Sequence, residues 1–331
     1  MLQQKTLMSE RRFCYTRGMH TATSHTYLFG PVPSRRLGRS LGVDLVPFKT
    51  CTLDCVYCEC GRTTALTMQR AEYVPTTAVL AELAEWCAAG GTADFITLAG
   101  SGEPTLHTGL ADIIRGIRAV TSIPVCILTN GTLFHLPEVR AAAALADVVV
   151  PSLDAPDAAT FARINRPAPG CDFERYLSGL RAFAVEFRGA LWLEILIVPG
   201  INDAEACVRE LARIAAELHP AKIQLNTAVR PPAEADVYPA SAERLHQLAQ
   251  FFTPQAEVVA SFRATVQEQT SAPLDAVLNL VRRRPCTVHD VAHGLSLSFS
   301  AARAALAELA ARGALVCEQH DSNEFYRAPG A

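Results

Sequence analysis

The feature that most constrains this chain is a group of three cysteines, Cys51, Cys55 and Cys58, spaced C-x3-C-x2-C. They follow an apolar run, Leu41 to Val46, that predicts a β-strand. So short a loop can fold around one inorganic centre. Three thiolates can hold three corners of a 4Fe-4S cluster, which leaves the fourth iron free to bind a small molecule instead of a side chain.

Two other inorganic sites compete with this interpretation, and both depend on Cys60. A structural zinc site needs four ligands, and Cys60 is the one extra thiol near the triad. A closed electron-transfer cluster needs the same fourth ligand, but Cys58-Glu59-Cys60 is an awkward spacing for two corners of one cube. A structural disulfide is less favoured, because nothing in the sequence marks the chain as secreted.

Composition indicates a water-soluble globular protein of about two domains. The 331 residues contain no apolar run long enough to span a membrane, and the net charge of −3 gives no global attraction to nucleic acid or membranes. Eleven cysteines, an odd number with three in a metal-like loop, predict a reducing compartment, so we expect a cytoplasmic protein. Residues 1–26 lack periodicity and predict a flexible tail.

The body of the chain alternates short apolar runs with amphipathic stretches. Residues 29–39 are rich in turn formers and arginine and predict a loop leading into the first strand. Six strands are expected, at 41–46, 95–99, 125–128, 148–150, 191–198 and 223–225, with helices between them. Six such units are too few to close an eight-stranded barrel. The sequence therefore predicts an α/β fold, a partial (β/α)6 TIM-like barrel over residues 27–260, with its site at the carboxyl ends of the strands.

Polar motifs follow the predicted strands. The stretch Gly100 to His107 places glycines beside Glu103, where a ligand can approach the backbone and its ammonium group can pair with a carboxylate. Ser152 and Asp154 share one side of a strand end and can hydrogen-bond vicinal hydroxyls. The turn Thr129-Asn130-Gly131 is expected to cap its own backbone. Read alone, the stretch from Gly100 to His107 is an ordinary strand-to-helix turn.

Taken together, these motifs resemble the radical S-adenosylmethionine (radical SAM) superfamily, over Tyr27 to about Phe252. The resemblance implies a 4Fe-4S cluster on the three cysteines and S-adenosylmethionine on its open iron, with an external electron donor of the flavodoxin or ferredoxin type. The cosubstrate contacts that it implies are Tyr57 beside the cluster, Gly102 and Glu103 for the methionyl amino group, Ser152 and Asp154 for the ribose, and Val198 and Gly200 for the adenine. The family's usual product is a 5'-deoxyadenosyl radical.

Within that superfamily the chain most resembles poorly characterised Fe-S oxidoreductases grouped with the wyosine synthetases, which modify transfer RNA. It departs from the archaeal wyosine enzymes, which bind a second cluster on three N-terminal cysteines and use a lysine to bind pyruvate. Upstream of Cys51 the chain has only Cys14, and it contains only three lysines. Wyosine synthesis is therefore not expected.

The substrate is not specified by these motifs: a transfer-RNA base, a peptide and a small metabolite all remain open. Asn226 and Arg230, at the end of the sixth strand, are candidates for the substrate pocket. Arg166 is a third candidate, as a clamp for a carboxylate or substrate, although it can equally be a surface charge at a helix end.

The C-terminal residues 271–331 predict a winged helix-turn-helix: helices at 273–283, from Thr287 to Gly294 and from Ser298 to Arg312, then a two-stranded wing. Thr287 to Asp290 form a capping box. Six arginines are balanced by six acidic residues, so DNA binding is not favoured and docking of RNA, peptide or protein, or a lid role, is preferred. A redox-sensing transcription regulator acting through this unit is the alternative function.

Overall fold

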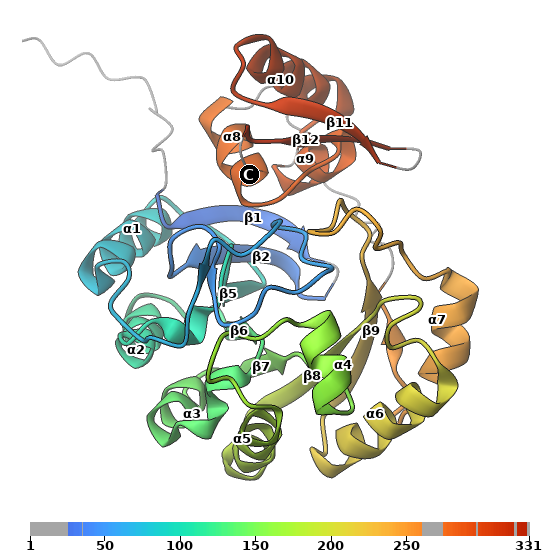
Figure 1. The fold of residues 1–331 in the computed structure, drawn as a ribbon. Helices are drawn as coiled ribbons and strands as arrows, with labels where there is room; N and C mark the ends of the chain where they lie inside the picture. The colour runs from blue at the N-terminus through green and yellow to red at the C-terminus, as the bar shows by residue number, and fades with distance from the viewer. Residues whose placement is uncertain (1–25, 35, 260–273, 296, 321–322, 330–331) are drawn as a thin grey trace, which may run out of the picture.

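The computed structural model describes residues 26–34, 36–259, 274–295, 297–320 and 323–329. The expected flexible tail lies outside the described residues except for Thr26. One eight-stranded sheet forms the body, in the order β1-β2-β5-β6-β7-β8-β9-β10. Every neighbouring pair except β1 and β2 is parallel. Figure 1 shows the sheet curving with helices on its outer side.

The strands and helices alternate as the sequence predicts, which confirms the α/β class with a largely parallel sheet. The six predicted strands are β2 (Gly38–Asp44), β5 (Phe95–Ala99), β6 (Val125–Thr129), β7 (Val148–Pro151), β8 (Ala190–Ile197) and β9 (Lys222–Thr227). The helices between and after them are α1 (Thr76–Ala88), α2 (Leu110–Val120), α3 (Pro137–Ala143), α4 (Ala158–Ile164), α5 (Phe173–Glu186), α6 (Glu205–Glu217) and α7 (Ala242–Ala249). Short 3-10 turns, η1 (Pro104–Leu106) and η2 (Thr132–His135), follow β5 and β6, and β10 (Glu257–Val258) extends the sheet beyond β9.

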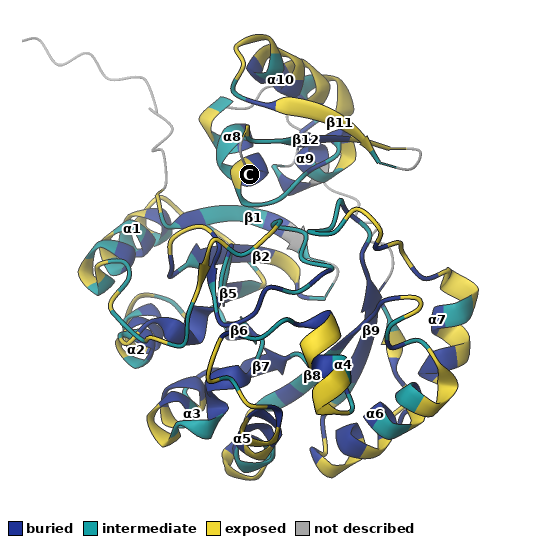
Figure 2. Cartoon of the chain, in the orientation of Figure 1, coloured by how far each residue is buried: buried dark blue, intermediate teal, exposed yellow. Residues whose placement is uncertain are grey.

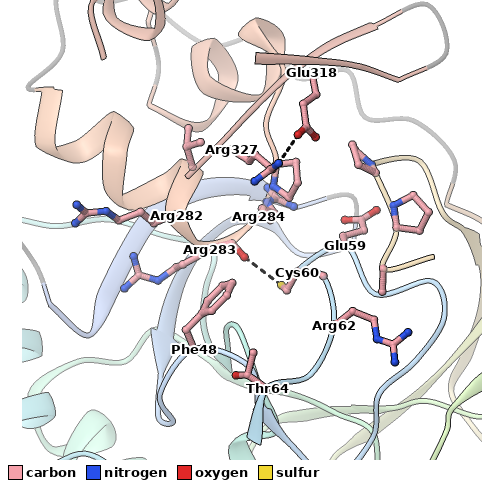
Figure 3. Close-up of a pocket in the computed structure, with 16 residues that line it drawn as sticks. Phe48, Glu59, Cys60, Arg62, Thr64, Arg282, Arg283, Arg284, Glu318 and Arg327 are labelled. Carbon is pink, nitrogen blue, oxygen red and sulfur yellow. Dashed lines mark hydrogen bonds and ion pairs between the residues drawn. The ribbon is translucent and has the colours of Figure 1, made fainter. Parts of the chain in front are cut away.

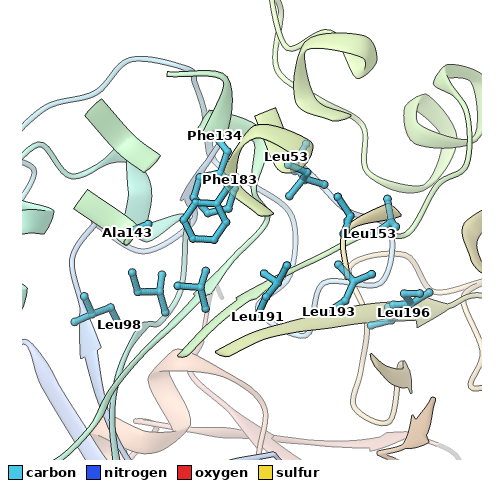
Figure 4. Close-up of a cluster of buried hydrophobic side chains, with 14 of the residues drawn as sticks. Leu53, Leu98, Phe134, Ala143, Leu153, Phe183, Leu191, Leu193 and Leu196 are labelled. Atoms are coloured by element: carbon cyan, nitrogen blue, oxygen red, sulfur yellow. The ribbon is translucent and has the colours of Figure 1, made fainter. Parts of the chain in front are cut away.

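Two-residue periodicity sorts the strand side chains between two environments. Side chains on the outer side of the sheet, such as Leu98 and Leu193, pack against the helices in the main hydrophobic core (Figure 4). In the same core the rings of Phe134 and Phe183 stack with their centroids 4.2 Å apart. Buried residues accordingly line the helix faces that meet the sheet, and exposed ones lie on the far sides (Figure 2). The alternate positions face the concave side and are mixed: Thr97 and Glu194 are polar, whereas another set belongs to a small apolar cluster with Cys126, Val148 and Val150.

The predicted N-terminal loop is wrong in part, because residues Leu28–Ser34 form a strand, β1, antiparallel to β2. Its two prolines argued for a turn, but an edge strand has one side without ladder partners and tolerates proline. The register shifts between Phe29 and Val32, so the strand bulges where Pro31 falls. Leu28 packs into the main core and Val32 into the core of the C-terminal unit.

The C-terminal unit comprises α8 (Leu274–Arg283), α9 (Val288–Gly294), α10 (Phe299–Ala311) and an antiparallel hairpin of β11 (Val316–His320) and β12 (Asn323–Arg327). The capping box before α9 is present: Asp290 N donates to Thr287 Oγ1 at 3.1 Å, and Thr287 N donates to Asp290 Oδ2 at 2.9 Å. The unit lies along β1 (Figure 1), and its core includes Val32 of that strand. Among the described residues, no helix is long and apolar enough to cross a membrane.

Candidate functional site

The cysteine loop is held from both sides by segments that follow other strands. Its ends are tied by a short parallel pairing of β3 (Thr50–Cys51) with β4 (Ala65–Leu66). Asp54 N donates to Asn165 O at 3.0 Å and Val56 N to Ile164 O at 2.9 Å, which fastens the loop to the end of α4. Leu53 and Val56 are buried in the main core. The loop is therefore anchored by its apolar residues, while its three cysteines, Cys51, Cys55 and Cys58, are half-buried.

Each of the three sulfurs has a nitrogen donor close by. Asn130 Nδ2 lies 3.5 Å from the sulfur of Cys51, Asn165 Nδ2 lies 3.3 Å from that of Cys55, and Lys49 Nζ lies 3.1 Å from that of Cys58. Such donors stabilise negative charge on sulfur. The predicted local role of Asn130 is also confirmed, because its Oδ1 accepts from Thr132 N at 3.0 Å.

The donor set suits a polynuclear cluster better than a single ion. Among the described residues, no three His, Cys, Asp or Glu side chains are close enough together to hold one metal ion. Burial raises the pKa of the Cys51 thiol to about 12 and raises that of Cys55. A hydrogen bond with Cys60 and the ammonium of Lys49 lower the pKa of Cys58 to about 6, against the effect of burial. Bound iron would offset the cost of ionising the first two thiols.

Glu103 lies at the end of β5, buried beside the cysteine loop. Its carboxylate accepts hydrogen bonds from Thr105 N at 3.0 Å, Thr129 Oγ1 at 2.6 Å and Asn130 N at 2.8 Å. Burial raises its pKa in spite of these donors, and its charge in turn raises the pKa of Cys51. The position gives a fixed, desolvated carboxylate next to the first cysteine.

Gly102 allows the chain before Glu103 to approach the cysteine loop closely, because it has no side chain. A Cβ atom there would lie 2.1 Å from the carbonyl oxygen of Thr50, in the cysteine loop. Glu103 N donates to that same oxygen at 3.1 Å. The glycine thus lets the strand end and the loop meet backbone to backbone.

A second buried carboxylate, Asp154, lies after β7. Asp154 Oδ1 accepts from Leu196 N at 2.9 Å and Oδ2 from Asn165 Nδ2 at 3.0 Å, and the hydroxyl of Tyr57 donates to Oδ2 as well. Burial raises the pKa of Asp154 to about 6. Ser152 is half-buried, and its backbone forms an isolated parallel β-bridge with Glu194 on β8. Tyr57 and Asn165 therefore connect the cysteine loop to this carboxylate.

The turn after β8 is organised by Asn202, which is fully buried. Asn202 Nδ2 donates to Asp154 O at 2.9 Å and to Leu196 O at 2.8 Å, and Val198 N donates to Asn202 Oδ1 at 2.7 Å. It does not cap α6, whose N-cap is Ala204. Gly200 adopts a φ of 79°, and nothing would contact a Cβ there within 4 Å. Val198 and Gly200 thus lie one strand away from Asp154.

The three substrate-pocket candidates do not converge on one point. Asn226 Nδ2 donates to Glu194 Oε1 at 3.0 Å, on the concave side of the sheet. Arg166 contacts Asp54 and Glu234 at the edge of the cysteine loop. Arg230 is buried between Glu59 Oε2 and Asp290 Oδ1, each 2.7 Å away.

Three residues near the cysteines were given no role at the cluster by the sequence. Asn165 lies beside the candidate Arg166, Lys49 opens the cysteine stretch, and Asn130 was expected only to cap its own turn. The amides of Asn165 and Asn130 reach the sulfurs because the end of α4 and the turn after β6 lie over the loop, whereas Lys49 reaches Cys58 from the start of the loop itself. No spacing in the sequence signals that contact.

Comparison with known proteins decides the family. The family model described as Radical SAM superfamily matches residues 45–212, which include the cysteine loop and both strand-end carboxylates. The chain belongs to the radical SAM superfamily. It is therefore an enzyme whose cofactors are a 4Fe-4S cluster and S-adenosylmethionine.

The radical SAM chain also belongs with a group of uncharacterised relatives. It is 34% identical to a UPF0026 protein of Methanocaldococcus jannaschii, over 69% of this chain and 71% of that protein. It is 33% identical to a UPF0026 protein of Helicobacter pylori strain J99, over 80% of this chain and 86% of that one. A Brachyspira hyodysenteriae protein named GTPase Obg is 35% identical over 85% of this chain, which spans only 42% of that protein.

Solved structures share the fold at much lower identity. A structure of TYW1 with a lysine-pyruvate adduct bound has a TM-score of 0.50 and 18% identity, covering 69% of this chain and 76% of that one. Streptococcus suis SuiB bound to S-adenosylmethionine also has a TM-score of 0.50, with 14% identity, 67% of this chain and 50% of that chain. These likenesses support the radical SAM partial barrel as the fold of the body.

Proposed function

We propose that Cys51, Cys55 and Cys58 hold the 4Fe-4S cluster of this radical SAM enzyme. The observation that carries the proposal is the donor beside each sulfur, an amide at Cys51 and Cys55 and an ammonium at Cys58. Cys60 is left outside this ligand set, because its sulfur lies 3.1 Å from Arg283 O and it also hydrogen-bonds Cys58, so it supports a ligand instead of replacing one. The open iron is then left for S-adenosylmethionine.

The cosubstrate is proposed to lie across the strand ends from β5 to β8. Glu103 would hold the amino group, with Gly102 letting it approach the loop, and Ser152 and Asp154 would hold the ribose. Tyr57 would orient Asp154, and Val198 and Gly200 would face the adenine. Bound there, the cluster and S-adenosylmethionine supply reductive cleavage of a carbon-sulfur bond, by default giving a 5'-deoxyadenosyl radical.

The protein is proposed to act in the cytoplasm on a transfer-RNA base, a peptide or a small metabolite, with an electron donor of the flavodoxin or ferredoxin type. Residues 27–260 form the radical SAM barrel in this proposal, and residues 271–331 form a winged helix. Three helices followed by an antiparallel hairpin support that assignment. Its even charge balance favours docking of RNA, peptide or protein over DNA. A redox-sensing regulator gains no support from the family match or the relatives.

Electron paramagnetic resonance of the reduced, reconstituted protein tests the proposal directly. S-adenosylmethionine should change the cluster signal in the wild type, since it would bind the open iron. An unchanged signal would refute that binding. Anaerobic product analysis should then yield 5'-deoxyadenosine; methylthioadenosine instead would move the cleavage to another carbon-sulfur bond.

A further inference from the structure

A small cavity of about 170 Å³ lies within the concave side of the barrel, under the far end of the cysteine loop. The walls come from β1, β2, β5 and β6, and include the hydroxyls of Ser40 and Thr97. Glu59 and Cys60 close it from the loop, and Leu280, Arg283 and Arg284 close it from the C-terminal unit. It is distinct from the strand-end positions proposed for S-adenosylmethionine.

The charge on the lining is strongly one-sided. Four arginines line this cavity, and Glu59 is the one carboxylate among the described lining residues. Three of these arginines also contact a carboxylate that is not part of the lining: Arg36 contacts Glu194, Arg230 contacts Asp290 and Arg283 contacts Asp44. The four arginines are Arg36, Arg230, Arg283 and Arg284.

Two guanidinium nitrogens of the arginines at this cavity lack an acceptor in the described part of the chain. The Nε atoms of Arg230 and Arg283 are buried and have no hydrogen-bond partner in the described part of the chain. Arg283 Nε lies 3.7 Å from Asp44 Oδ2, which is too far for a hydrogen bond. Arg284 acts on Asp290 only through longer-range electrostatics. These two nitrogens are closed to solvent and do not themselves face the cavity, so the lining attracts an oxyanion through the charge of its four guanidinium groups.

A larger cavity of about 340 Å³ adjoins the first one, and Figure 3 shows it between the cysteine loop and the C-terminal unit. Both cavities are lined by Glu59, Cys60, Arg283 and Arg284. The hydrogen bond from Cys60 to Arg283 O lies where they meet. Small-ligand sites usually measure about 300–1,000 Å³, so the outer cavity can hold a small molecule, whereas the inner one fits only a group of it.

We propose that the inner cavity binds the anionic group, a carboxylate or a phosphate, of the enzyme's substrate, and that the outer cavity holds the remainder. This rests on the proposed radical SAM function. Because Arg283 and Arg284 come from the C-terminal unit, that unit supplies half of the cationic lining. It is then part of the substrate pocket and not only a docking module.

The test uses the full chain with its cluster reconstituted anaerobically and two probes, inorganic phosphate and acetate, titrated by calorimetry. Saturable binding of at least one probe is expected, and the tighter of the two identifies a phosphorylated or a carboxylic substrate. Arg284→Gln should weaken that binding roughly 10- to 150-fold, the range for losing a charged hydrogen bond. Arg284→Lys, which keeps the charge, should lose less and guards against a folding defect in the first variant.

The matched control is Arg303→Gln, which removes an exposed arginine of α10 in the same C-terminal unit that lines neither cavity. Its anion binding should equal that of the wild type. No saturable binding of either probe, or an equal loss in both Gln variants, would overturn the anion site. Cleavage of S-adenosylmethionine, assayed in the same samples, distinguishes the two proposals. Anion binding without cleavage would refute the proposed function, and cleavage without anion binding would refute the anion site.

Discussion

Within the cysteine loop, neighbouring residues have opposite tasks. Three residues of the loop are buried and fix it to the core: Thr52, Leu53 and Val56. The three cysteines beside them stay half-buried. The packing that positions the loop is thus separate from the thiols that would bind iron. A thiol can consequently be removed without opening the core.

Cys55→Ala should sharply lower the iron content and the visible absorbance while leaving the unfolding midpoint nearly unchanged. The other two thiols cannot hold the cube securely, and the core contacts of Leu53 and Val56 remain. Iron analysis and a thermal melt measure both effects. Cys171→Ala is the control, since it removes a half-buried thiol outside the loop. Full iron retention by the Cys55 variant would exclude the loop as the ligand set.

Glu103→Gln should keep the cluster but bind S-adenosylmethionine more weakly. Losing one charge-assisted hydrogen bond corresponds to about 1.5–3 kcal/mol, or roughly 10- to 150-fold in affinity. Equilibrium binding to the reconstituted protein measures the change. Glu174→Gln, at an exposed position in the first turn of α5, serves as the control. An unaltered dissociation constant would remove Glu103 from the cosubstrate site.

Asp154 gives the site a pH dependence. Its pKa is raised from 3.8 to about 6 by burial, so the folded protein holds this proton more tightly than the unfolded chain does. The carboxylate accepts ribose hydroxyls best when ionised, so affinity for S-adenosylmethionine should fall as the pH is lowered through about 6. Asp154→Asn should bind weakly at all pH values and lose this inflection. A wild-type affinity that is flat from pH 5 to pH 8 would contradict the assignment.

Residue types and spacing identified the cysteines and the strand-end carboxylates, because both follow directly from the position of a strand end in the chain. The contacts of Lys49 and Asn165 were not predictable in the same way. The contact of Asn165 depends on how the end of α4 packs over the loop, and that of Lys49 on how the loop itself turns, and no local pattern encodes either. The sequence therefore predicted which groups carry charge better than which groups stabilise that charge.

At the scale of elements, apolar runs predicted the six parallel strands, since a strand buried on both faces needs an unbroken run of apolar residues. The strand β1 was not predicted, because its prolines suggested a turn although an edge strand tolerates them, and because its pairing partner lies beyond a turn. α4 was also missed; it has only seven residues, too few for a clear periodicity. The helix nevertheless matters for the site, because Asn165 at its C-terminal end donates to the sulfur of Cys55.

The contact between α9 and the segment after β9 gives a testable element-scale effect. Arg230, in that segment, is buried and forms ion pairs with the half-buried Glu59 and Asp290. Although burial opposes it, the guanidinium groups of Arg230 and Arg284 lower the pKa of Asp290 to about 2. Asp290→Asn should lower the free energy of unfolding by about 1.5–3 kcal/mol, the cost of losing a charged hydrogen bond.

Urea unfolding at neutral pH measures this loss, and Asp275→Asn at the exposed start of α8 is the control. The depressed pKa stabilises the fold above the unfolded value of 3.8 and ceases to do so as the pH falls through about 2. The difference between wild type and Asp290→Asn should therefore shrink over that acid range. A pH-independent difference would assign the loss to packing instead of charge.

At the scale of the whole molecule, the change of pattern near residue 271 predicted a separate C-terminal unit. The structure shows how closely that unit is joined to the body. The Arg283 guanidinium lies 4.6 Å from the centre of the Phe29 ring, and Val32 is buried in the core of the C-terminal unit. Such contacts between segments far apart in sequence are what a composition profile cannot report.

Removal of residues 271–331 should therefore destabilise the barrel instead of leaving it intact. Truncation exposes Phe29 and Val32 on an edge strand, a surface prone to pairing with other chains, and leaves Arg230 without Asp290. The truncated chain should aggregate and hold less iron, as light scattering and iron analysis can measure. The double variant Phe29→Ser with Val32→Thr, made in the truncated chain, should reduce the aggregation by making that edge polar. A truncated protein that stays monomeric and keeps its cluster would show that the two units are independent, and the C-terminal arginines would then have no part in forming the barrel cavity.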